Sequence, residues 1–303
     1  MDFVTVCFKN DLPQMSLQAA SMDKFLRDFP VDRIIVILNE DTDAARSYFH
    51  DKVWPLYGHL IERVVLVNHT GMADHKILPC PHCKKRNPGC TYCYQQHLKL
   101  LGSRLVSSDF YCILDAKNWL TRTWTMKDIQ DDRGRLRITY DPGIDPNWRG
   151  HRRDSLSYFG FDDEQHPPIC NLTPFFVYTD IARGIVDDSA LIQRWSETPM
   201  TEFYLLEGAI LKKHGSVDAA YWKSPTFMTS IWPFTIEQLD MDTMMSEFIE
   251  PKRETLCSGM HRNCYRMLTE RNIRELVDNY VRLNLLDEQQ TLALIDEMKI
   301  LND

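Results

Sequence analysis

The chain has 303 residues, of which 44% are hydrophobic and 26% charged, the proportions of a globular protein with a sizeable core. This composition excludes a disordered, collagen-like or disulfide-scaffold protein. The formal net charge of −8 repels polyanions, so nucleic acid is not an expected partner. The first residues lack a signal peptide, and no run of about 18 apolar residues predicts a spanning helix, so we expect a cytoplasmic protein.

Apolar, β-branched runs alternate with helical patterns in the first third of the chain. The runs at residues 3–8, 33–38 and 63–67 predict strands, and helices are predicted over 16–29 and from Thr42 onward. Near-continuous apolar strands separated by helices are typical of a mostly parallel sheet that is covered on both faces. The sequence therefore predicts an α/β fold of the Rossmann-like kind.

Polar residues follow the first two predicted strands. They are Lys9, Asn10 and Asp11 after the first strand and residues 39–41 after the second. Sheets of this kind bind their ligands beyond the carboxyl ends of the strands. We therefore expect the functional site at this edge of the sheet.

A small cysteine-rich inserted loop interrupts the alternation at residues 79–93. Its cysteines form two CxxC turns, Cys80 with Cys83 and Cys90 with Cys93. Each turn can bend two sulfurs toward one centre, so the spacing predicts a structural zinc ion with no open coordination position. Four free thiols or a disulfide pair are the alternatives, and the total of nine cysteines suits a reducing compartment.

The next predicted strand, at residues 110–114, ends directly in Asp115-Ala116-Lys117-Asn118. The turn resembles the DxD turn with which nucleotide-sugar glycosyltransferases hold a divalent metal against a diphosphate. Lys117 stands at the second acidic position, where it cannot ligate Mg²⁺ or Mn²⁺ but can neutralise a phosphate itself. Whether a Mn²⁺ or Mg²⁺ ion binds at this turn therefore stays open, and weak or absent dependence of the activity on such a metal is favoured. A solvated strand-ending turn is the alternative.

The second half of the chain predicts one more strand and several helices. The polar stretch at 141–166 predicts an active-site loop with three clustered arginines, Arg149, Arg152 and Arg153. A flexible, solvated basic loop is favoured, and binding of a diphosphate or an anionic acceptor is the alternative. A strand is predicted at 175–178, followed by helices at 189–197 and 201–214. Residues 269–303 predict C-terminal helices that pack on the domain or form a homodimer contact.

Seven short segments, taken together, carry a family resemblance. They are Val4–Asp11, Asn39–Asp41, Tyr94–Leu100, Phe110–Asn118, Asn171–Phe175, Thr201–Leu205 and Ser258–Arg262. Together they resemble a bacterial GT-A-type glycosyltransferase family of capsule and O-antigen gene clusters, long labelled a domain of unknown function. The resemblance implies one GT-A-like domain over residues 1–268, with residues 79–93 as an insertion outside the family pattern and 269–303 as a helical extension.

The resemblance also implies an enzyme. Its members transfer a sugar, here a hexose from a UDP-sugar donor, to a hydroxyl of a surface glycan, and we favour inversion. Glu202 would be the general base, Asp115 would position the donor, and Lys117 with His261 would stabilise the leaving diphosphate. The residues implied to bind the donor are Lys9, Asn10, Asp11, Gln95, Gln96, Lys99, Asn118, Thr173, His261 and Arg262. Such an enzyme would work at the inner face of the membrane, beside other glycan machinery.

Other interpretations stay open at this point. A non-catalytic zinc-knuckle binding or scaffold protein would carry the same strand-end residues without binding a donor. A nucleotidyltransferase is disfavoured, because Asp115 has no nearby carboxylate with which to hold two metal ions. Glu202 in a first helical turn is also an ordinary solvated position, and a lone histidine such as His261 is commonly structural.

Overall fold

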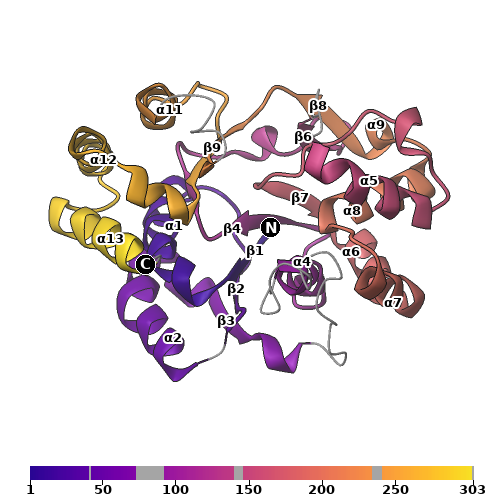
Figure 1. Cartoon of the computed structure of the whole chain (residues 1–303), viewed down its shortest axis with the longest axis horizontal. Helices are drawn as coiled ribbons and strands as arrows, with labels where there is room; N and C mark the ends of the chain where they lie inside the picture. The colour runs from indigo at the N-terminus through magenta and orange to yellow at the C-terminus, as the bar shows by residue number, and fades with distance from the viewer. Residues whose placement is uncertain (41, 73–91, 140–145, 234–240, 302–303) are drawn as a thin grey trace.

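The computed structural model describes residues 1–40, 42–72, 92–139, 146–233 and 241–301. Its centre is a five-stranded sheet with the order β3-β2-β1-β4-β7 (Figure 1). The strands are β1 (Asp2–Cys7), β2 (Ile34–Leu38), β3 (Val64–Asn68), β4 (Phe110–Asp115) and β7 (Phe175–Tyr178). The first four run parallel, and β7 is antiparallel to β4. The predicted α/β fold with a mostly parallel sheet is confirmed.

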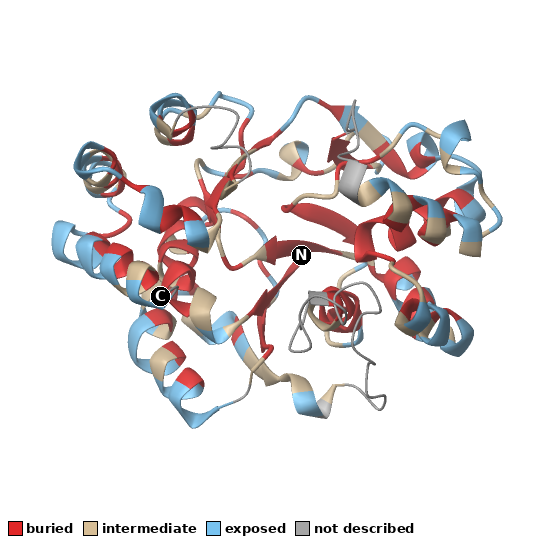
Figure 2. Ribbon diagram, viewed as in Figure 1, coloured by how far each residue is buried: buried red, intermediate tan, exposed pale blue. Residues whose placement is uncertain are grey.

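The middle of the sheet is buried on both faces. Every residue of β1 and β2 is buried, as the near-continuous apolar runs predict (Figure 2). In the register of the sheet, Val4 of β1 pairs with Ile35 of β2 on one side and with Ile113 of β4 on the other. The core therefore continues from one helical layer through the sheet to the other.

The direction in which strands are added reverses between β1 and β4. The chain passes from β1 through α1 (Leu12–Phe25) to β2, and then through α2 (Asp43–Tyr48), η2 (Phe49–Val53) and η3 (Trp54–Arg63) to β3. It reaches β4, on the other side of β1, through α4 (Tyr92–Leu101). Because parallel crossovers are right-handed, α1 and α4 cover opposite faces. The ends of β1 and β4 are therefore the switch point at which such sheets bind ligands.

Two small sheets accompany the central one. β5 (Asn118–Leu120), β10 (Cys257–Met260) and β9 (Met228–Ile231) form the first, and β6 (Leu136–Thr139) pairs with β8 (Tyr221–Ser224) in the second. In the first sheet Gly259 lies opposite Asn118. A Cβ atom at Gly259 would lie 3.0 Å from Asn118 Nδ2 and 3.3 Å from the Lys117 carbonyl oxygen. Glycine here lets β10 approach the turn that follows β4.

The remaining helices surround these sheets (Figure 1). They are α5 (Pro146–Tyr158), α6 (Thr179–Val186), α7 (Ser189–Glu197), α8 (Glu202–His214), α9 (Val217–Ala220), α11 (Met241–Ile249), α12 (Glu270–Arg282) and α13 (Glu288–Ile300). Short 3-10 helices are η1 (Lys9–Asp11), η4 (His69–Gly71), η5 (Gly102–Arg104), η6 (Met126–Asp128), η7 (Asp163–Gln165) and η8 (Arg262–Met267). α13 packs against α1, α12 and η8. Within the described ranges, no helix combines the length and the apolar character needed to cross a membrane.

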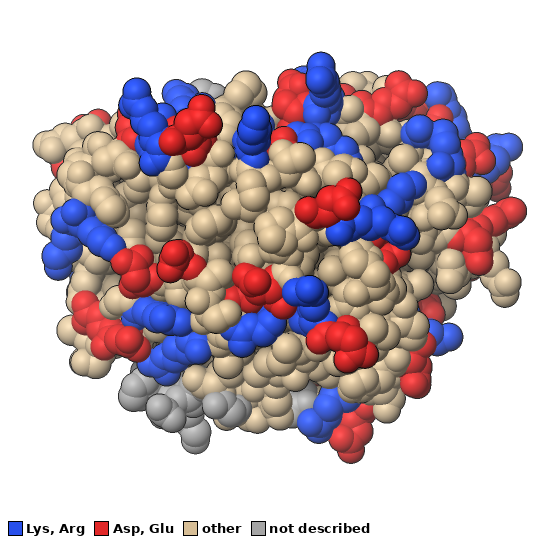
Figure 3. Space-filling model, turned by 180° about the vertical axis from the view of Figure 1, so that it is seen from behind, with Lys and Arg blue, Asp and Glu red and all other residues tan. Residues whose placement is uncertain are grey.

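The surface mixes charges of both signs. Figure 3 shows Lys and Arg side chains next to Asp and Glu side chains over the face seen from behind. Exposed ion pairs such as Arg104 with Asp187 and Arg271 with Glu275 belong to this pattern. Pairs of this kind contribute little to stability, so the structurally important charges are those that are buried.

Within the described part of residues 141–166, the prediction of a solvated basic loop is wrong for the backbone and for Arg152, but Arg149 and Arg153 are exposed as predicted. Residues Pro146–Tyr158 form α5, and Arg152 on this helix is buried. Its Nε and Nη2 atoms donate to the two carboxylate oxygens of Glu207 at 3.0 and 2.5 Å. It also donates to the backbone oxygens of Asp163 and His166 at 2.6 and 2.9 Å. A guanidinium whose donors are satisfied in this way can be buried, which composition alone does not reveal.

We predict that Arg152→Ala lowers the free energy of unfolding by about 3–5 kcal/mol, because Glu207 would be left buried and unpaired. Urea denaturation followed by circular dichroism measures this loss. The matched control is Arg153→Ala, one residue away with a side chain that is 67% exposed, which should change stability by less than about 0.5 kcal/mol. Equal effects of the two substitutions would contradict a structural role for the Arg152–Glu207 pair.

Candidate active site

The turn after β4 lies at the switch point and is held by a hydrogen bond within the turn and by bonds from the segment before β7 and from α1. Asn118 Oδ1 accepts from the Asp115 backbone N–H at 2.7 Å. Thr173 Oγ1 lies 2.7 Å from Asn118 Oδ1 and 2.9 Å from Asp115 Oδ2, so its single hydroxyl hydrogen can serve either acceptor. On α1, Gln18 Nε2 donates to the backbone oxygens of Asp115 and Asn118 at 2.9 and 3.0 Å. The position of the turn is therefore set by the sheet and by α1 together.

Four charged side chains of alternating sign lead from the interior to this turn. Glu202 Oε1 on α8 lies 3.1 Å from Lys99 Nζ on α4, and Lys99 Nζ lies 2.9 Å from Asp115 Oδ1. Asp115 Oδ2 in turn lies 2.5 Å from Lys117 Nζ. The Glu202 and Lys99 side chains are 1% and 4% exposed, whereas Asp115 and Lys117 are 21% and 10% exposed. We call these four residues the charge chain.

The charge chain fixes the protonation of its members. Burial raises the pKa of Asp115, but the ammonium groups of Lys117 and Lys99 outweigh this and hold it well below its usual range. Burial lowers the pKa of Lys99, but Asp115 and Glu202 outweigh this and raise it above its usual value. For Glu202, burial dominates over the attraction of Lys99, and the pKa is raised. At neutral pH, Asp115 is ionised and Lys99 carries a proton.

A second group lies where β1 and β10 end. Arg262 Nη1 donates to Asp11 Oδ1 at 3.0 Å, which joins the segment after β10 to η1. The His261 ring stacks on Trp232, with ring centroids 5.0 Å apart and an interplanar angle of 29°. On the same indole, Lys117 Nζ lies 4.6 Å from the ring centroid. This aromatic contact connects the second group to the charge chain.

His261 is neutral at physiological pH. Burial, with the nearby positive charges of Lys117 and Arg262, lowers the pKa of His261 to about 4. A neutral imidazole next to Lys117 adds no repulsion. Lys99, Lys117 and Arg262 are therefore the cations near the turn, and His261, expected to share the diphosphate charge with Lys117, could meet a ligand only as a neutral ring.

The other residues implied by the family resemblance lie at the rim or within α4. Lys9 Nζ pairs with Glu40 at 2.8 Å on the exposed rim. Asn10 Nδ2 donates to the backbone oxygen of Leu301 at 3.2 Å, so it faces the C-terminal helix. Gln95 is half-buried and Gln96 is buried on the helix that carries Lys99. The structure brings Lys99, Asp115, Lys117, Asn118, Thr173 and Glu202 into one network and leaves Lys9 and Asn10 with other partners.

Sequence reasoning missed two residues of this region. Gln18 is buried in α1, and the recurrence of Gln14, Gln18 and Ser21 at helical spacing on the buried face is a signal that could have been noticed. Trp232 follows β9 directly, and nothing in its local sequence indicates that its ring would lie beneath Lys117. Both matter through contacts with residues far away in the chain.

The turn does not fit a divalent cation. Both carboxylate oxygens of Asp115 contact ammonium groups, and Thr173 lies against one of them. Over the described ranges, His, Cys, Asp and Glu side chains nowhere gather in a group of three or more that could hold a metal ion. Hard cations require several oxygen ligands, which this turn lacks. Three cysteines of the predicted zinc site, Cys80, Cys83 and Cys90, lie outside the described residues. The fourth, Cys93, is buried at the start of α4.

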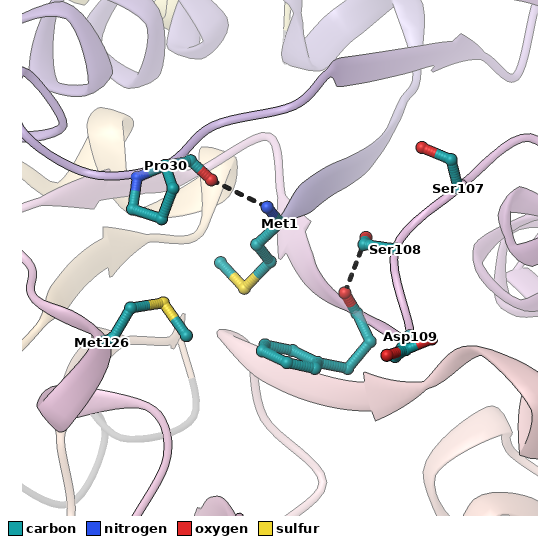
Figure 4. Close-up of a pocket in the computed structure, with 7 residues that line it drawn as sticks. Met1, Pro30, Ser107, Ser108, Asp109 and Met126 are labelled. Carbon is teal, nitrogen blue, oxygen red and sulfur yellow. Dashed lines mark hydrogen bonds between the residues drawn. The ribbon is translucent and has the colours of Figure 1, made fainter.

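A pocket at the opposite end of the sheet is a different feature (Figure 4). Its lining includes Met1 and Phe110, which lie at the amino ends of β1 and β4, together with Met126. The α-ammonium group of Met1 donates to the Pro30 backbone oxygen at 2.7 Å. Because sheets of this kind bind ligands at the carboxyl ends of their strands, this pocket is not the candidate active site.

Comparison with solved structures identifies similar folds. The chain aligns with galactosyltransferase LgtC in complex with donor and acceptor sugar analogs at 12% identity and a TM-score of 0.53, covering 91% of this chain and 95% of that chain. An active-site mutant of LgtC aligns at 14% identity and a TM-score of 0.53, covering 91% and 94%. No family model and no curated protein sequence matches the chain. At this identity the likeness concerns the fold, and it confirms the predicted GT-A-like class.

The charge chain predicts a specific dependence of stability on pH. Because the pKa of Asp115 is depressed in the folded state, its contribution is present above its unfolded value of about 3.9 and is lost as the pH falls below it. Wild-type protein should therefore lose more unfolding free energy between pH 5 and pH 2 than Asp115→Asn does. Urea midpoints measured across this range test the difference.

The exposed carboxylate Asp132 supplies the control for this measurement. The Asp132→Asn variant should follow the wild-type pH curve. An Asp115→Asn variant with the same pH slope as the wild type would show that the carboxylate is not held ionised by its lysine partners.

Proposed function

We propose that this chain is a glycosyltransferase that moves a sugar from a nucleotide-sugar donor to a hydroxyl of a glycan. The observation that carries the proposal is the placement of Lys117 and Lys99 around Asp115 at the switch point. A diphosphate needs fixed positive charge, and the switch point is where α/β sheets bind nucleotides. The fold shared with galactosyltransferase LgtC supports the same reading.

The finer parts of the proposal follow the family resemblance. The donor is proposed to be a UDP-sugar carrying a hexose, and the acceptor a bacterial surface glycan. Asp11, after β1, and Arg262, after β10, are proposed to lie near the nucleoside, and the turn at Asp115 near the diphosphate. The four cysteines of residues 79–93 are proposed to hold a structural zinc ion away from the chemistry.

Inversion requires one group to take the proton of the attacking hydroxyl. The acceptor oxygen bonds to the anomeric carbon while the bond to the diphosphate breaks, and the bonding electrons leave with the diphosphate. Glu202 is proposed as the base, and its raised pKa suits a proton acceptor. Its carboxylate lies behind Lys99, so this role requires the acceptor hydroxyl to reach past the Lys99 side chain. Asp115 is nearer the surface, but its depressed pKa makes it a poor base.

We predict that one nucleoside diphosphate stabilises the protein. Ligand that binds the folded state at 100 times its Kd adds about 2.7 kcal/mol, which raises the melting temperature by several degrees. A thermal-shift screen with UDP, GDP, CMP and their sugars measures this. A selective shift by one nucleotide identifies the donor. The absence of any shift would reject the transferase and favour the non-catalytic zinc-knuckle protein.

We also predict that Glu202→Gln lowers kcat by at least about 100-fold while the Kd for the donor nucleotide stays within a few-fold of wild type. Turnover and calorimetric binding are measured on the same preparations, with melting temperatures as a check of folding. Glu197→Gln, at an exposed position on α7, is the control and should behave as wild type. Substantial residual turnover would reject Glu202 as the base. Parallel losses of binding and turnover would instead assign it to positioning Lys99.

A further inference from the structure

The Lys117 side chain is held in a fixed position, whereas most lysines extend their ammonium group into solvent. Its ammonium group lies 2.5 Å from Asp115 Oδ2 on one side and 4.6 Å from the centroid of the Trp232 ring on another. A cation over an indole face is attracted by the ring electrons, more strongly where water is excluded. The Lys117 side chain is only 10% exposed, so the rotameric freedom of a surface lysine is already lost. The cation is therefore placed before any ligand arrives.

The ammonium group also has bonding capacity left. A lysine ammonium has three N–H donors, and Lys117 gives one of them to Asp115. The Lys99 ammonium, in contrast, already contacts Asp115 and Glu202 and is 4% exposed. Lys117 is the member of the charge chain that can donate to phosphate oxygens, while Lys99 keeps Asp115 ionised and in place behind it.

A divalent cation would meet repulsion at this turn. To be ligated by Asp115 it would have to displace an ammonium group from one of the carboxylate oxygens. Lys99 on α4 is buried, and moving its ammonium group away from Asp115 and Glu202 would leave these carboxylates without that partner. A dication would therefore lie beside at least one buried ammonium group.

We propose that the Lys117 ammonium, positioned by Trp232 and backed by Lys99, binds the donor diphosphate in place of a divalent cation, so that nucleotide binding requires no metal. The inference rests on the proposed function, since it concerns the same site. It assigns Lys117 as the residue that contacts the diphosphate and Trp232 as a positioning residue. His261, which stacks on Trp232 and stays neutral, supports the indole without competing for the anion.

A charge exchange tests the proposal directly. UDP and GDP binding is measured by isothermal titration calorimetry on the full chain, in EDTA and in Mn²⁺. For the wild type, the Kd should agree within about two-fold between the two conditions. Lys117→Asp creates a second carboxylate two residues after Asp115 and should bind about 10- to 100-fold more weakly in EDTA. Adding Mn²⁺ should recover most of this loss of affinity for Lys117→Asp and should not improve binding by the other variants.

Four further variants make the test specific. Lys117→Met should be weakened in both conditions, whereas Lys117→Arg keeps the charge and should bind in EDTA within about ten-fold of wild type. Trp232→Leu should weaken binding in EDTA by several-fold. Lys127→Asp, on the exposed turn η6, makes the same charge change away from the site and should leave Kd unchanged. Melting curves confirm that each variant is folded.

The outcomes separate this inference from the proposed function. Wild-type binding that appears only with Mn²⁺ would overturn the inference and leave the transferase standing. Nucleotide binding by folded Lys117→Met in EDTA with the wild-type Kd would also overturn the inference and leave the transferase standing. Failure of every nucleotide to bind under both conditions would reject the proposed function itself.

Discussion

The buried ammonium group of Lys99 is the interaction on which the site depends. It lies between two carboxylates, Asp115 at the end of β4 and Glu202 at the start of α8, and it is itself carried by α4. Removing a charge from water is strongly unfavourable unless partners of opposite sign replace the hydration. None of these three elements can shift without leaving a charge unpaired in the interior. The relative positions of α4, α8 and the sheet edge are therefore coupled.

Helix α8 shows how the same constraint shapes the surrounding layer. It contains two buried carboxylates, Glu202 and Glu207, five residues apart and therefore directed to different sides of the helix. Glu202 reaches Lys99 on α4, and Glu207 reaches Arg152 on α5. The helix has almost no solvated stripe, and its charged residues act as connections to its neighbours. Only one of the two pairs belongs to the strand-end site; the other holds α5.

The fold could be predicted from the sequence to a large extent. The apolar runs at 3–8, 33–38 and 110–114 are strands of the central sheet, because burial on both faces leaves a continuous apolar run that is visible locally. The turn at Asp115 could be located for the same reason, since it follows such a run directly. Lys99 and Thr173, in contrast, entered through a family resemblance, and their bonds to Asp115 could not be inferred from spacing.

The sequence by itself determined the parallel sheet, the strand edge that carries the site, and the lysine in the second acidic position of the turn, because each is a local property of the chain. Only the tertiary structure decided which charges are buried and what they contact. Arg152 becomes an interior ion pair, His261 a neutral ring, and Lys117 a cation held against Trp232. The physical reason is that desolvation and ion pairing depend on distances between groups far apart in the sequence, and those distances exist only once the helices have packed on the sheet.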